Sequence, residues 1–155
     1  MPKYLGRNAI SLFSSPHPAS ISHFQLCEFE NIDGLAMVHS SVLTSLERVR
    51  LDLALHLRQT VHLIITDAVR TQSDLDRLAA KYGWQKDGGK VAENSMHLAK
   101  HGGIAVDLIA KLADSHHPIS QHLLAQYCRL HFDFVCATYS DGHVHADNRH
   151  HKLIA

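Results

Sequence analysis

The stretch Gly102-Gly103-Ile104-Ala105-Val106-Asp107 leads from two glycines into an apolar run, 104–109, that we predict to be a β-strand. The run places the carboxylate of Asp107 inside or at the start of this strand. Ser95-Met96-His97 precedes it, and His143-Val144-His145 follows nearer the C-terminus. Together these motifs offer a carboxylate and imidazoles, which are ligands of catalytic zinc sites that keep the fourth position open.

The His143-Val144-His145 motif follows a turn signal, Asp141-Gly142, and we predict a returning strand over 143–146. Alternate residues of a strand share a face, so both imidazoles point the same way while Val144 faces the core. One imidazole can then bind a metal ion while its neighbour handles protons. A zinc ion held by two imidazoles and a carboxylate lowers the pKa of its bound water to about 7, which suits amide hydrolysis.

The rest of the chain indicates helices that are separated by strands. Between 38 and 57, apolar residues recur at the three-to-four spacing of an amphipathic helix. The β-branched run 61–66 is typical of a buried strand, and 73–82 of a helix that Gly83 ends. We predict a loop over 83–94, a helix over 119–130 and a strand over 132–138. This order favours an α+β domain whose small, mainly antiparallel sheet is flanked by helices.

Length and composition predict a single domain. With 155 residues and 45% apolar content, the chain can bury one core but is too short for two ordinary domains. Serine, proline and small polar residues dominate the first part of the chain, so we predict an irregular arm over 1–22 and one domain over 23–155. We expect this domain to act as a monomer.

Charge, cysteine content and hydropathy argue against several classes of protein. Lys plus Arg equals Asp plus Glu at 15 each, so we expect no basic surface for nucleic acid or an anionic membrane. Three cysteines cannot all pair and show no Cys-x-x-Cys spacing, which indicates free, buried thiols and a reducing compartment. No hydrophobic run is long enough for a signal peptide or a membrane span, and we expect neither.

These motifs resemble those of a known family, the zinc D-Ala-D-Ala carboxypeptidases and related phage endolysin peptidases, which share their fold with the hedgehog signalling domain. The family's Ser-x-His, Gly-x-Ala-x-Asp and His-x-His correspond here to 95–97, 103–107 and 143–145. The segment Ile64–Thr71 is similar to the family's strand ending in Ser-Gly-x-Arg-Ser/Thr, with Arg70 at the arginine. His23–Phe29 also resembles a segment of small phage-encoded members. The resemblance therefore runs from about residue 23 to residue 149.

The resemblance implies a role for each of these motif residues. His97, Asp107 and His145 would bind Zn²⁺, and His143 would be a catalytic partner beside the metal ion. Arg70 would face the substrate, where a guanidinium can hold a carboxylate or carbonyl through charge-assisted hydrogen bonds. Ser95 would hydrogen-bond the substrate or fix its own loop.

The chain departs from the family in the spacing of its first two ligands. The family's gap from histidine to aspartate is seven positions, whereas His97 lies ten positions before Asp107 and His101 lies six before it. We favour His97, because Ser95 keeps its register with it and three extra residues within 98–102 can bulge outward. His101 stays open as the alternative first ligand.

The resemblance implies a zinc metallopeptidase that cuts the stem peptide of bacterial peptidoglycan, as a D,D-carboxypeptidase or as an endolysin-type endopeptidase such as an L-Ala-D-Glu endopeptidase. Small size suits a phage-encoded enzyme that is made in the bacterial cytoplasm and reaches the cell wall on release or from the virion. One alternative is a catalytically silent relative that binds zinc. Another is a His-Asn-His nuclease built from His143, Asn148 and His151, which the short spacing and the neutral charge disfavour.

Overall fold

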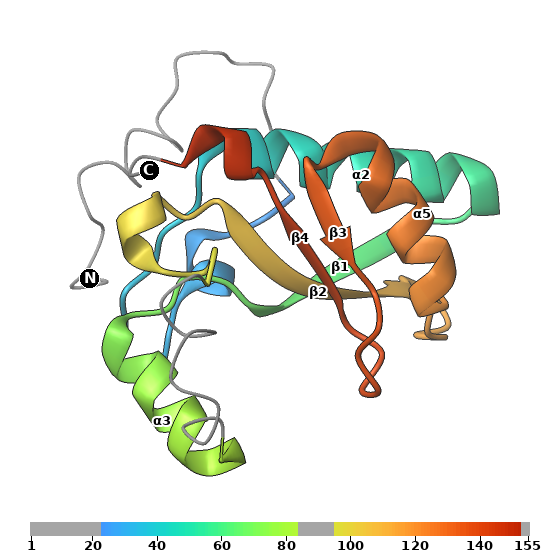
Figure 1. Ribbon diagram of the computed structural model, residues 1–155. Helices are drawn as coiled ribbons and strands as arrows, with labels where there is room; N and C mark the ends of the chain where they lie inside the picture. The colour runs from blue at the N-terminus through green and yellow to red at the C-terminus, as the bar shows by residue number, and fades with distance from the viewer. Residues whose placement is uncertain (1–22, 84–94, 153–155) are drawn as a thin grey trace.

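The computed structural model describes residues 23–83 and 95–152, and within them three α-helices and an antiparallel sheet of four strands (Figure 1). The sheet has the order β1-β2-β4-β3, so β2 and β4, which carry two of the predicted ligands, lie at its centre. The elements are α2 (Ser40–Leu57), α3 (Gln72–Tyr82), α5 (Gln121–His131), β1 (Val61–Asp67), β2 (Ala105–Leu112), β3 (Phe134–Cys136), β4 (Val144–Asp147) and the 3-10 helices Leu26–Phe29, Ala99–His101 and Arg149–His151. The predicted α+β class is confirmed.

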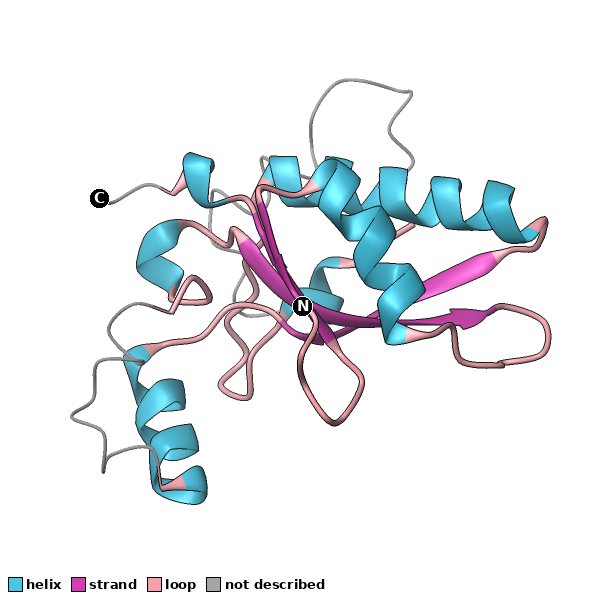
Figure 2. Ribbon diagram, turned by 45° about the vertical axis from the view of Figure 1, so that its right-hand side comes forward, coloured by secondary structure: helices cyan, strands magenta, loops and turns pink. Residues whose placement is uncertain are grey.

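Helices α2 and α5 cover one face of the sheet, whereas α3 follows the end of β1 and stands to the side (Figure 1 and Figure 2). On α2 the fully buried residues recur at helical spacing, and they are Val42, Leu46, Val49 and Leu53. They share a core with Leu108 of β2 and Val144 of β4. Burying a side chain of this size contributes roughly 1.5–3 kcal/mol, so this layer stabilises the fold. The opposite face of the sheet carries the polar side chains of Asp107 and His145.

The helix boundaries differ from the predicted ones because side chains cap the helices. The helix predicted from 38 begins at Ser40, since the ring of His39 accepts a hydrogen bond from the Ser41 N–H at 3.1 Å. The helix predicted from 119 begins at Gln121, since the Ser120 hydroxyl caps it. The helix predicted from 73 begins at Gln72, since the Thr71 side chain caps it.

The strand boundaries differ more, because pairing rather than composition sets them. The strand predicted over 104–109 continues to Leu112, which pairs with Val61. The strand predicted over 132–138 is shortened to Phe134–Cys136, the part that pairs with β4. The returning strand begins at Val144, so His143 lies in the turn before it.

The predicted arm over 1–22 and most of the predicted loop over 83–94 lie outside the described residues. Within 23–83 and 95–152, no helix is long and apolar enough to cross a membrane. The three cysteines are free, but only Cys128 is buried, and burial raises its pKa to about 12. Cys27 is exposed and Cys136 is half-buried, so the prediction of buried thiols is wrong for both.

A β-bulge in β1 turns one carboxylate to the polar face of the sheet. Ile65 pairs with Leu108, yet Asp67 pairs with Asp107, so β1 contains one extra residue between these pairs. A shift of one residue moves a side chain to the other face of a strand. Ile65 therefore packs against the core, whereas Asp67 lies on the same face as Asp107.

Gly103 allows two backbone segments to approach each other just before β2. Its φ is +74°, in the left-handed region, and its carbonyl accepts a hydrogen bond from the His39 N–H at 2.8 Å. A Cβ atom at this position would lie 2.9 Å from the backbone of Val38 and from the side chain of Met37. Only glycine fits here without displacing the segment that leads into α2.

Replacing Gly103 with alanine is expected to lower the free energy of unfolding by about 3 kcal/mol, because the left-handed conformation and the backbone overlap both oppose a Cβ atom. Gly83→Ala is the matched control: its φ is +72°, but nothing lies within 4 Å of the added atom, so we expect a loss of about 1 kcal/mol. Urea denaturation of both variants measures the difference. Equal losses would contradict the proposed close approach at Gly103.

Candidate metal centre

Three side chains that the sequence singled out converge on the polar face of the sheet. His97 Nε2 lies 3.1 Å from Asp107 Oδ1 and 3.0 Å from His145 Nδ1, and His145 Nδ1 lies 3.0 Å from Asp107 Oδ1. The side chains of His97, Asp107 and His145 are only 4%, 9% and 12% exposed. They lie close enough together to bind one metal ion.

The sheet and one short parallel bridge bring these residues together. Asp107 of β2 and His145 of β4 are direct partners in the ladder, so their side chains share a face. His97 comes from the segment before Ala99–His101, which is fixed by backbone pairing with Arg70. The Arg70 N–H donates to the His97 carbonyl at 2.7 Å, and the Ala99 N–H donates to the Arg70 carbonyl at 2.9 Å.

The outer nitrogen of each imidazole is held by an acceptor. His97 Nδ1 lies 2.5 Å from the Ala68 carbonyl oxygen, which can only accept, so Nδ1 carries the proton and Nε2 of the neutral ring presents a lone pair. His145 Nε2 lies 2.9 Å from Oδ2 of Asp147, which likewise leaves a lone pair on Nδ1 when the ring is neutral. Two nitrogen lone pairs and a carboxylate oxygen therefore face one another. This arrangement needs a cation, and such outer partners are typical of histidines that bind metal ions.

The electrostatics of the centre favour a positive charge. Burial alone would raise the pKa of Asp107, but hydrogen bonds with His145 and His97 outweigh burial and hold the pKa well below its usual range. Burial lowers the pKa of His145, yet hydrogen bonds to Asp107 and Asp147 raise it to about 9. In the absence of a metal ion, a proton on His145 supplies the positive charge. A metal ion must displace that proton.

His143 lies beside this group without belonging to it. Its Nε2 atom is 3.7 Å from Oδ2 of Asp107, and its side chain is 17% exposed. Val144 is fully buried in the core, so the alternation predicted for 143–145 is present. The Nδ1 atom of His143 lies 2.5 Å from Oδ1 of Asp141. His143 is thus placed to exchange protons next to the three converging ligands.

Arg70 is held by two carboxylates at the end of β1. Its Nε donates to Oδ2 of Asp67 at 2.7 Å, and its Nη2 contacts the same oxygen at 2.5 Å and Oδ2 of Asp107 at 3.4 Å. The bulge in β1 places Asp67 for this contact. Arg70 therefore binds the oxygen of Asp107 that points away from the two imidazoles, and Asp67 offsets part of its charge.

Ser95 and His101 lie outside the group of ligand atoms. The Ser95 hydroxyl accepts a long hydrogen bond of 3.4 Å from the His97 N–H, which corresponds to the loop-fixing role among the two predicted for it. The insertion expected to bulge outward does so only in part. Ala99–His101 form a 3-10 helix in which Lys100 is exposed, but His101 is 6% exposed and its ring is buried.

Sequence reasoning missed the groups that orient the ligands. Asp147 belongs to none of the predicted motifs, but it is fully buried in β4, where its carboxylate bonds His145 and receives two hydrogen bonds from the side chain of Arg149 and one from its backbone N–H. A signal was present, because Asp147 continues the alternation of His143 and His145 along one strand face. Nothing in the sequence marked the Ala68 carbonyl or Asp67.

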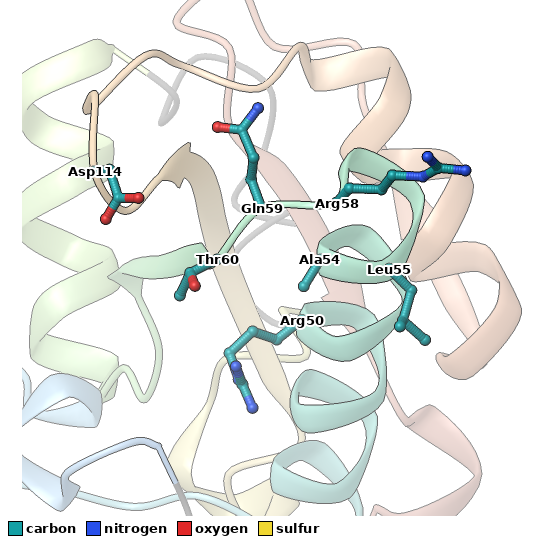
Figure 3. A pocket seen from close by; sticks show the side chains of 7 residues that line it. All are labelled: Arg50, Ala54, Leu55, Arg58, Gln59, Thr60 and Asp114. Carbon is teal, nitrogen blue, oxygen red and sulfur yellow. The ribbon is translucent and has the colours of Figure 1, made fainter.

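A hollow at the opposite end of β1 contains none of the candidate site residues (Figure 3). It lies where α2 ends and β1 begins, and it also borders the connection after β2. Its lining residues are Arg50, Ala54, Leu55, Arg58, Gln59, Thr60 and Asp114. The converging histidines and aspartate therefore remain the candidate site.

The chain is expected to bind one Zn²⁺ ion tightly, and His97→Ala is expected to weaken that binding by at least roughly 100-fold, since even loss of a residue that only orients a ligand costs 10–100-fold. His101→Ala is the matched control, and we expect it to retain the tight site. Competition with a chromophoric chelator measures the affinity, and circular dichroism confirms folding. Loss of the tight site in the His101 variant alone would reverse the assignment.

Metal affinity is expected to rise with pH up to about 9, because zinc must displace the proton that His145 carries below its raised pKa. The rise should be about tenfold per pH unit, and about one proton should be released for each ion bound at pH 6. Calorimetry in two buffers of different ionisation enthalpy counts the released protons. Binding without proton release at pH 6 would contradict the protonation state described above.

Comparison with known proteins does not supply a relative for this chain. No protein-family model matches it, and no curated protein or solved structure matches it. The interpretation of the centre therefore depends on the chemistry of its own side chains.

Proposed function

We propose that this protein is a zinc metallopeptidase that hydrolyses peptide bonds of bacterial peptidoglycan. The observation that carries the proposal is the convergence of two imidazole lone pairs and one carboxylate oxygen at 3.0–3.1 Å. Ligands of a tetrahedral zinc ion, at bond lengths of 2.0–2.1 Å, are about 3.3 Å apart, so small movements would complete such a site. Three protein ligands of this type leave a fourth position for water, as in catalytic zinc sites.

Residues around the centre can support hydrolysis of an amide. His97, Asp107 and His145 would hold the zinc ion, which would supply a Lewis acid and make water a better nucleophile at neutral pH. His143 keeps its Nε2 atom near Asp107, where it can take up a proton and return it to the leaving amine. Arg70 fixes Oδ2 of Asp107 and, in this proposal, also binds the peptide.

The choice of peptidoglycan as substrate rests on the resemblance of the motifs. Ser-x-His, Gly-x-Ala-x-Asp and His-x-His are those of the D-Ala-D-Ala carboxypeptidases and phage endolysin peptidases, and we propose that the α+β arrangement is a hedgehog/DD-peptidase fold. The substrate would be the stem peptide, and the enzyme would act as a monomer. It would be phage-encoded, made in the bacterial cytoplasm, and would reach the wall on release or from the virion.

A catalytically silent zinc-binding protein is the second candidate. It is supported by the Arg70 guanidinium, whose Nε and Nη2 atoms are both engaged by Asp67 rather than left for a substrate. The position of His143 favours the enzyme, because a structural metal site needs no proton-exchanging group beside it. The nuclease is disfavoured, since the Asn148 amide is buried and donates to Ser41 and Ser45 of α2, away from the centre.

Purified peptidoglycan is expected to release peptide fragments when treated with the zinc-loaded protein, and a chelator should abolish the release because it removes the Lewis acid. Added Zn²⁺ should restore it. Asp107→Asn, which keeps the shape of the side chain but weakens the ligand, should be inactive. Mass spectrometry of the fragments identifies the bond that is cut. Equal release with and without chelator would rule out the metal mechanism, and absence of any release from zinc-loaded protein would favour the silent relative.

A further inference from the structure

We propose that Asp141 and Tyr139 are positioning residues that hold the His143 imidazole in one tautomer and one orientation toward the metal centre. This inference rests on the proposed function, because it assigns the groups that prepare His143 for proton transfer. Both residues lie in the connection between β3 and β4 (Figure 1). Neither belongs to the group of converging ligands.

Asp141 fixes the protonation of the ring. Its Oδ1 atom lies 2.5 Å from His143 Nδ1, and the same oxygen accepts a hydrogen bond from the His143 N–H at 3.2 Å. An ionised carboxylate only accepts, so Nδ1 donates to Asp141 and Nε2 is the nitrogen left to face the metal centre. That Nε2 atom is the one near Oδ2 of Asp107. The carboxylate thus directs the basic nitrogen to the centre, as in catalytic Asp–His pairs.

Tyr139 fixes the plane of the ring. Its aromatic ring stacks on the His143 imidazole with centroids 4.0 Å apart and an angle of 19° between the planes. The stacked ring covers one face of the imidazole and restricts rotation about its side-chain bond, which a hydrogen bond from one nitrogen cannot do alone. The tyrosine and the carboxylate therefore constrain different degrees of freedom of the same side chain.

The connection that carries these residues is itself anchored to α5. The Gln121 amide donates to the carbonyl of Tyr139 at 3.0 Å and to that of His143 at 2.7 Å, so one side chain joins both ends of the turn. The Gly142 N–H also donates to the Tyr139 carbonyl at 3.2 Å, and the φ of +85° at Gly142 closes the turn. These contacts hold Asp141 and Tyr139 at fixed positions relative to His143.

The first arm of the test measures hydrolysis of dye-labelled peptidoglycan by zinc-loaded variants. We expect Asp141→Ala to lower kcat by about 10–100-fold with little change in KM and in zinc content, because orientation is lost while ligands and binding surface are kept. Asp141→Asn retains an acceptor oxygen and should lose less. Tyr139→Phe, which keeps the stacked ring, should lose far less than Tyr139→Leu.

Asp52→Ala is the matched control, since Asp52 also bonds a histidine, His131, at 2.6 Å, but on α2 and α5 behind the sheet. We expect its kcat to match that of the unmodified protein. An Asp141→Ala variant that also keeps the full kcat would overturn the proposal. A loss that is as large in the Asp52 variant would mean that the effect is general destabilisation, and would overturn it as well.

The second arm does not need activity. Nitrogen-15 NMR of the zinc-loaded protein, with His143→Gln to assign the ring, should show a protonated Nδ1 and an unprotonated Nε2 on His143. Asp141→Ala should shift the ring toward the other tautomer. An unchanged tautomer would overturn the proposal. If the protein does not cleave peptidoglycan, the proposed function fails, while this measurement still decides whether Asp141 sets the state of His143.

Discussion

Two imidazole nitrogens and one carboxylate oxygen face one another at 3.0–3.1 Å, and the outer nitrogen of each ring is already bound to an acceptor. Lone pairs at this separation repel one another unless a cation lies among them. A proton on His145 can supply this positive charge. A metal ion supplies it with better geometry, because it contacts all three atoms at once. The rest of the site is arranged around this requirement.

One face of the sheet packs against the helices, and the other face carries the converging residues. Leu108 and Val144 pack beneath the helices, and their neighbours Asp107 and His145 therefore lie on the other face as direct partners. The bulge in β1 adds Asp67 to the same face, where it holds Arg70 against Asp107. Because Asp107 and His145 come from the two central strands, the layer that stabilises the fold also fixes the positions of two of the three converging residues.

The group proposed to move protons is built differently from the group proposed to hold the metal ion. His143 lies in a turn and is oriented by Asp141 and Tyr139, both of which are at the surface. Arg70 differs from His143, since it is half-buried between two carboxylates and its backbone also fixes the segment that carries His97. A substitution at Arg70 would therefore remove the side-chain contacts with Asp67 and Asp107.

The sequence by itself determined the class of fold, the approximate span of each strand and α-helix, and the short set of candidate ligands, Asp107, His145 and either His97 or His101. These features follow from local periodicity, from capping residues and from short motifs, all of which are encoded within a few neighbouring positions. Only the tertiary structure decided that His97 rather than His101 joins Asp107 and His145, that Asp67 faces Arg70, and that the Ala68 carbonyl and Asp147 orient the two rings. These contacts depend on a bulge, a strand register and a backbone bridge between distant segments. Such long-range pairings are set by the packing of the whole domain, and no local pattern records them.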